Sequence, residues 1–159
     1  MSDNNQGRSG YKKTKMGWIP KKWTLEPLYK IASVRASNVD KKITINQKKV
    51  FLCNYMDVFH NDYITCDIKF MKATATESEI KKFKLYKNDV IITKDSETRE
   101  DIAKASFVVE NVENLLCGYH LSIIRPNEKI IDGLFLSKLL MINMLHNYFV
   151  SHANGVTRF

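Results

Sequence analysis

Short runs of β-branched and aromatic residues, each bounded by polar or turn-forming residues, recur between residues 50 and 125 and constrain the fold more than any other feature. Such runs are typical of β-strands that are at least half buried. Several of them alternate apolar and polar side chains, so we expect a curved, mainly antiparallel sheet. The predicted strands are residues 50–54, 66–71, 89–93, 106–110 and 115–125.

Helical signals flank and interrupt these runs. Thr76 and Glu79 have the spacing of a capping box and predict the start of a helix. An apolar face in residues 25–31 predicts a short first helix. Toward the C-terminus apolar residues recur every three or four positions, which predicts one long C-terminal helix from an Asp132 N-cap to a stop at residues 154–155. The expected fold class is therefore α+β, a curved sheet with a few helices.

Basic residues are concentrated in the first third of the chain. The formal net charge is +8, and residues 1–50 hold 12 Lys or Arg against three acidic residues. This asymmetry favours a polyanionic partner, for which nucleic acid is the first candidate and an anionic membrane surface the second; a lysine-rich solubilising surface is the structural alternative. We assign residues 1–16 to a flexible basic arm and residues 17–159 to one domain. The cations expected to contact phosphate are Arg35, Lys41, Lys42, Lys48 and Lys49.

Cysteine usage and hydropathy limit the compartment. Cys53, Cys66 and Cys117 are widely spaced and form no C-x-x-C pair, so neither a zinc site nor a disulfide framework is indicated. The N-terminal residues lack the apolar core of a signal peptide, and polar side chains interrupt the most apolar stretch, residues 134–150. We therefore expect a cytoplasmic protein without a membrane partner.

Four pieces of sequence occur in a specific order: GWIPKKW at residues 17–23, ITKDSETREDI at residues 92–102, CGYHL at residues 117–121, and Gly-x-Thr-Arg at residues 155–158. In this order and spacing, residues 17–159 resemble one target recognition domain of a type I restriction-modification specificity subunit. In that family two such domains, separated by helical spacers, each read one half of a split DNA site. The resemblance implies sequence-specific binding of double-stranded DNA, with no catalysis by this chain.

The resemblance also implies partners. Specificity subunits of this family dock methyltransferase subunits, which use S-adenosylmethionine, and through them a nuclease and translocase subunit, which uses ATP and Mg²⁺. No cofactor is expected in this chain itself. The resemblance stops at Phe159, before the spacer helix and second recognition domain of the family. Ala103 stands where the family often has glycine after an Asp-Ile pair, which is expected to alter the backbone path of that loop.

A DNA-reading protein needs cations that hold phosphates and side chains with paired donors or acceptors that meet base edges. Residues 93–99 supply both kinds in one block, and Asn54 offers the amide that matches adenine. We expect the loops around residues 54–57, 93–101 and 117–120 to enter the major groove. The predicted DNA-binding residues are Asn54, Tyr55, Asp57, Lys94, Asp95, Ser96, Glu97, Thr98, Arg99, Tyr119, His120, Thr157 and Arg158.

These assignments have structural alternatives. Residues 93–99 can form a solvated loop with local ion pairs. Asn54 or Asp57 can bond its own backbone in a turn, and His120 can be an ordinary core or surface residue.

Two functional rivals remain at this stage. One is a truncated remnant or protein-interaction module that no longer reads DNA. The other is a Mg²⁺-dependent nuclease in which Asp57 joins Asp67 and Lys69, the last two on one face of a predicted strand. A methyltransferase or ATP-driven motor is excluded for this chain, because the sequence lacks both an Asp/Asn-Pro-Pro-Tyr segment and a P-loop.

Overall fold

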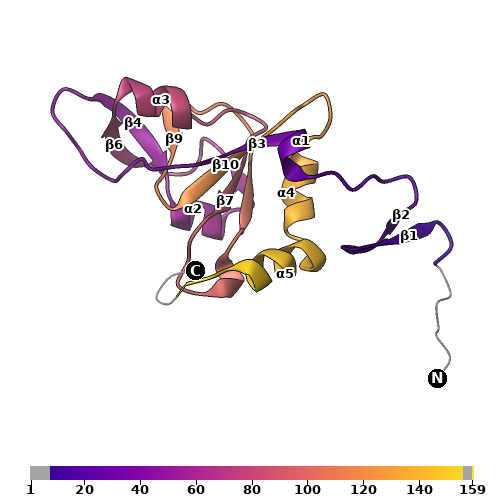
Figure 1. Ribbon diagram of the computed structural model, residues 1–159. Coiled ribbons are helices and arrows are strands. Elements are labelled where there is room, and N and C mark those ends of the chain that lie inside the picture. Colours follow the sequence, from indigo (N-terminus) through magenta and orange to yellow (C-terminus); the bar gives the residue numbers. More distant parts are fainter. Residues whose placement is uncertain (1–7, 156–158) are drawn as a thin grey trace.

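Two β-sheets form the centre of the molecule in the computed structural model, which describes residues 8–155 and Phe159 (Figure 1). The larger sheet has five strands in the order β3 (Ala32–Ala36), β10 (Leu121–Pro126), β7 (Val90–Thr93), β8 (Ala105–Val108) and β5 (Tyr63–Ile64). All of its pairs are antiparallel except β5 with β8. In the smaller sheet β4 (Lys48–Cys53) lies between β6 (Met71–Ala75), which is antiparallel to it, and β9 (Leu115–Cys117), which is parallel to it.

Helices connect and cover these sheets, which confirms the predicted α+β class. Two of the predicted helix starts are present. Glu79 donates its N–H to the Thr76 hydroxyl at 3.2 Å while its carboxylate accepts the Thr76 N–H at 2.8 Å, and Asp132 accepts the Phe135 N–H at 2.8 Å. The helical elements are α1 (Leu28–Ile31), α2 (Tyr55–His60), α3 (Glu77–Phe83), the 3-10 turn η1 (Arg99–Asp101), α4 (Gly133–Leu140) and α5 (Asn143–His152).

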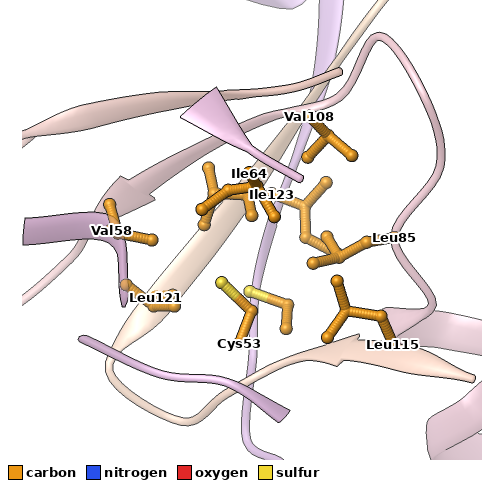
Figure 2. Close-up of a cluster of buried hydrophobic side chains, with 10 residues drawn as sticks. Cys53, Val58, Ile64, Leu85, Val108, Leu115, Leu121 and Ile123 are labelled. Carbon is orange, nitrogen blue, oxygen red and sulfur yellow. The ribbon is translucent and has the colours of Figure 1, made fainter. Parts of the chain in front are cut away.

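Both faces of the five-stranded sheet are buried. Ile91 and Ile123 pair across β7 and β10 and face the cluster between the sheets that Figure 2 shows, to which α2 adds Val58. Val90 and Ile124, one residue along each strand, face the opposite side and pack with Leu136 and Leu140 of α4. A third cluster lies between the smaller sheet and α3. Strand alternation therefore places apolar side chains in two separate layers.

The strand predicted at residues 66–71 is wrong. Residues 66–70 form a turn in which Ile68 and Phe70 pack partly buried against the cluster between the sheets. Their alternation reflects that packing rather than a hydrogen-bonded ladder. The single strand predicted over residues 115–125 is also wrong, because it divides at Gly118 into β9 and β10, which belong to different sheets.

The predicted helices are partly wrong. The first helix is shorter than residues 25–31, because it begins only after Pro27, whose backbone is extended. The single long C-terminal helix is instead α4 and α5, with Ile142 extended between them. The break redirects the chain so that the His146 Nε2 atom of α5 lies 2.8 Å from the Glu100 carbonyl oxygen of η1. The apolar period of three and four continues across the break, which is why the pattern predicts a single helix.

A β-hairpin spans the predicted boundary between arm and domain. In it β1 (Tyr11–Thr14) pairs antiparallel with β2 (Gly17–Pro20), and Figure 1 shows it projecting from the rest of the molecule. The turn is closed by Gly17, whose φ of +102° favours glycine. The division predicted after residue 16 therefore lies inside one element of structure.

Candidate nucleic-acid interface

Three segments far apart in the sequence meet where four strands end. β4 and β9 run parallel and end side by side at Cys53 and Cys117, and Thr93 at the end of β7 is opposite Leu121 at the start of β10. The Gly118 N–H donates to the Cys53 carbonyl at 2.8 Å, and the Lys94 N–H donates to the His120 carbonyl at 3.1 Å. We call residues 54–57, 93–101 and 117–120, which these contacts hold together, the loop cluster.

Gly118 permits the closest approach within the loop cluster. A Cβ atom at this position would lie 2.7 Å from the Cys53 carbonyl oxygen and 3.1 Å from the Asn54 Oδ1 atom. The first distance is shorter than a van der Waals contact and the obstacle is backbone, so a side chain there would push the two segments apart. The glycine of the CGYHL segment is thus required by packing.

Ser96 is the buried centre of the middle segment. Its side chain lies 2.9 Å from the Tyr55 hydroxyl, and its backbone exchanges two hydrogen bonds with Phe159, of 2.9 and 3.1 Å. Only 7% of its surface is exposed. Two of the predicted DNA-binding residues, Ser96 and Tyr55, therefore hold the segment of residues 93–101 against residues 54–57, and Ser96 also holds Phe159.

Lys94, Asp95 and His120 make further contacts between segments. His120 Nδ1 lies 2.5 Å from an Asp95 carboxylate oxygen. The Lys94 ammonium donates to the Ser37 carbonyl at 2.7 Å and lies 4.5 Å from the centre of the Tyr119 ring. These predicted contact residues are brought together in space, and each already has a partner within the protein.

Residues 54–57 are not the loop that the sequence predicts. They begin α2, and the Asp57 carboxylate accepts the Asn54 N–H at 2.7 Å, so the pair bonds to nearby backbone as in the structural alternative, but in a helix cap rather than a turn. Burial raises the pKa of Asp57, while the backbone hydrogen bond from Asn54 and the nearby charge of Lys41 lower it. Asp57 stabilises the first turn of the helix, as acidic residues at this position commonly do.

Four of the predicted DNA-binding residues in the loop cluster are exposed to solvent: Glu97, Thr98, Arg99 and Tyr119. The Thr98 hydroxyl donates to the Asp101 carboxylate at 2.6 Å. The Arg99 guanidinium lies 4.7 Å from the centre of the Phe159 ring, and 48% of Tyr119 is exposed. These side chains are the ones that an approaching ligand can reach. Thr157 and Arg158 lie outside the described residues.

The five cations predicted to contact phosphate are spread along residues 35–49, which we call the basic segment, rather than gathered beside the loop cluster. Arg35, on β3, donates to the Lys82 carbonyl at 3.0 Å. Lys42 pairs with Asp40 at 2.7 Å and Lys48 with Glu77 at 2.6 Å, all exposed. Lys48 begins β4 and is followed by Lys49; it lies six residues from Asn54, which corresponds to roughly 20 Å along a strand. Lys41 is the one of the five that acts electrostatically on Asp57.

Three residues that shape this region are not among the predicted site residues. Ser37 is buried, and its hydroxyl donates to the Cys117 carbonyl at 2.6 Å, which carries the basic segment across the ends of β9 and β10. Phe159 supplies the ring under Arg99. Ala103 is 2% exposed with a φ of +58°. Only Ala103 has a signal in the sequence, because it stands at a position where the resembled family often has glycine.

The geometry assumed for the nuclease alternative is absent. Asp67 and Lys69 lie in the turn of residues 66–70 rather than on one face of a strand, and the Asp57 carboxylate is bonded to the backbone of α2. Within residues 8–155 and Phe159, no group of three or more His, Cys, Asp or Glu side chains could hold a metal ion.

Comparison with models of protein families and with curated protein sequences gives no match for this chain. Among the described residues, no helix has the length and apolar character needed to cross a membrane.

Proposed function

We propose that this protein is a sequence-specific DNA-binding domain that reads one half of a bipartite site as the specificity component of a type I restriction-modification system. In this proposal it binds double-stranded DNA in the cytoplasm and has no catalytic activity of its own. Methylation with S-adenosylmethionine and ATP-driven cleavage with Mg²⁺ belong to methyltransferase and nuclease subunits that it directs.

The observation that carries the proposal is the loop cluster. Loops on a rigid scaffold are where proteins place binding residues, and base readout needs side chains held in register by their neighbours. Here Tyr55, Ser96, Asp95 and His120 join the segments. They leave exposed, at the same edge, an acid, a hydroxyl, a guanidinium and an aromatic ring. Those groups match the acceptors and donors of base edges.

Charge supports the same function. The net charge of +8 gives sequence-independent attraction to phosphates. The ion pairs of Lys42 and Lys48 are exposed and therefore weak, so phosphate can replace their carboxylate partners. Of the five predicted cations, Lys41 is the one whose charge acts on Asp57 in the loop cluster.

Selection from a random double-stranded DNA library tests the proposal. The expected result is enrichment of one short motif, with binding that weakens as salt concentration rises. Glu97→Ala is expected to relax the preference at a single base position, while Lys41→Ala weakens binding equally on all sequences. Salt-sensitive binding with no enriched motif would leave only a generic basic protein and would reject the proposal.

The protein-interaction alternative has one observation in its favour. Exposed apolar side chains lie between the hairpin and α4, where Trp23 packs edge-on against Phe135 at 5.5 Å between ring centres. These residues are 44% and 43% exposed. Failure of the DNA selection together with loss of a protein partner in Trp23→Ala would favour this alternative.

A further inference from the structure

Arg99 is the side chain of the loop cluster best prepared for a planar, two-point contact. It begins η1 and is exposed, and its guanidinium carbon lies 4.7 Å from the centre of the Phe159 ring. Within the described residues no hydrogen bond or ion pair uses this guanidinium. An arginine stacked on a ring retains its edge N–H groups for a ligand, while the ring restricts the plane of the fork.

The backbone that carries the ring beneath Arg99 is held in place. Phe159 donates its N–H to the Ser96 carbonyl at 2.9 Å and accepts the Ser96 N–H at 3.1 Å. Ser96 is in turn buried and bonded to Tyr55 at the start of α2. The backbone of Phe159 is thus anchored through Ser96 to α2, and this places its ring beside the Arg99 guanidinium.

The surroundings of Arg99 favour a base edge over a phosphate. Glu97 and Glu100 are exposed on either side of it in the chain, and Asp101 closes the same turn. Three carboxylates within two residues repel the full negative charge of a phosphate group more strongly than they repel the acceptors of an uncharged base edge. The base that offers two acceptors in the geometry of an arginine fork is guanine, through O6 and N7.

We propose that Arg99 is a specificity-determining residue that reads a guanine in the major groove, and that Phe159 is its positioning residue. This inference rests on the proposed DNA-binding function. One base of the half-site is then a guanine. The contact between Arg99 and Phe159 then serves recognition of that base rather than stability of the fold.

The test uses the full chain and the motif enriched in the library selection. Arg99→Ala and Arg99→Lys are each expected to lose a preference for one guanine by about 5- to 150-fold. Lys is included because it keeps the charge but not the two-point fork. Replacing that guanine by 7-deazaguanine removes N7, so it should weaken the wild-type protein and leave Arg99→Ala unaffected.

Phe159 is tested with the same modified base. Phe159→Leu keeps an apolar side chain without the ring and should reduce the sensitivity to 7-deazaguanine, while Phe159→Tyr keeps the ring and should restore it. Thermal unfolding confirms that each variant is folded. Lys138→Ala is the matched control, because it removes another exposed cation stacked on a ring, that of Tyr63 at 4.6 Å, outside the loop cluster.

The possible outcomes separate the two proposals. If no motif is enriched by the wild-type protein, the proposed function fails and this inference fails with it. If a motif is enriched but Arg99→Ala weakens all sequences equally, Arg99 contacts phosphate and the inference alone is overturned. An unchanged guanine preference in Arg99→Ala overturns it as well.

Discussion

Ala103 has a backbone conformation that alanine seldom adopts. Its φ is +58°, and it follows η1 in the turn that returns the chain to β8, where its N–H donates to the Thr93 carbonyl at 2.9 Å. The left-handed conformation costs an L-residue roughly 1–2 kcal/mol, and glycine avoids this cost. The resembled family often has glycine here, and glycine adopts this conformation readily. Ala103 therefore takes the kind of backbone path that a glycine would take, and the loop needs no altered path to explain it.

Substitution at Ala103 measures that strain. Both Ala103→Gly and Ala105→Gly are expected to change the free energy of unfolding. We expect the loss in Ala103→Gly to be smaller than the loss in Ala105→Gly by about 1–2 kcal/mol, because glycine relieves the strain at residue 103. Both residues are buried alanines, but Ala105 lies in β8 with ordinary strand geometry, so glycine there only loses packing and gains unfolded-state entropy. Urea unfolding of the two variants decides the point, and equal losses would contradict it.

The three cysteines differ in accessibility. Burial raises the pKa of the Cys53 and Cys117 thiols, which both lie in the core between the sheets; Figure 2 shows Cys53 there. Cys66 is exposed, and a hydrogen bond with the Glu110 carboxylate raises the pKa of its thiol above the ordinary value of 9.0. We therefore expect iodoacetamide to modify Cys66 alone in the folded protein and all three cysteines after denaturation.

The rate of Cys66 alkylation also depends on the Glu110 carboxylate. A raised pKa leaves less thiolate at any pH below it, so alkylation of Cys66 is slowed. Glu110→Gln removes the negative charge and should speed alkylation at pH 8, whereas Glu113→Gln, on a nearby exposed acid, should not. Mass spectrometry of the modified peptides gives both rates, and rapid modification of Cys53 in the folded protein would contradict the packing between the sheets.

At the scale of elements, local capping signals could be read from the sequence and tertiary breaks could not. The Thr76 and Glu79 capping box and the Asp132 N-cap depend on residues within one turn, and both are present. Asn54 and Asp57 have the same spacing as Thr76 and Glu79. Because residues 54–57 lie at the end of a predicted strand, the sequence predicts a loop there, and this prediction is wrong, since they begin α2. The break between α4 and α5 accompanies a contact of α5 with η1, and no local pattern contains that contact.

The capping box of α3 has a measurable contribution. Thr76→Ala removes the hydroxyl that accepts the Glu79 N–H and is expected to destabilise the protein by about 1 kcal/mol. Ser78→Ala, an exposed position two residues further into the same helix, is the control and should change stability by less than about 0.5 kcal/mol. Equal effects in urea unfolding would mean that the cap is not responsible.

At the scale of the whole molecule, the candidate site is created by topology. Each of its segments could be predicted as polar residues near a strand, but their meeting requires that β4 and β9 pair in parallel and that β7 and β10 pair in the other sheet. Sequence patterns do not encode which distant strands pair. For the same reason the roles of Ser37 and Phe159 could not be predicted, since each acts on a segment remote in the chain.

The charge of the whole molecule can be measured through the salt dependence of DNA binding. Each lysine that neutralises one phosphate contributes about 0.9 to the slope of the logarithm of the affinity against the logarithm of salt concentration. Lys41 is exposed and acts on Asp57 at the edge of the loop cluster. Lys41→Ala is therefore expected to reduce the slope by about one phosphate without changing the base preference.

The position of a lysine, rather than the total charge, decides between specific docking and general attraction. Lys129 is also exposed but lies beyond Pro126, at the opposite end of β10 from His120. Lys129→Ala changes the net charge by the same amount as Lys41→Ala, so a protein that docks through the loop cluster should keep its full salt slope in this variant. A fluorescence anisotropy titration at several salt concentrations gives both slopes. Equal reductions would mean that the cations act through net charge alone, and the loop cluster would then have no fixed orientation on DNA.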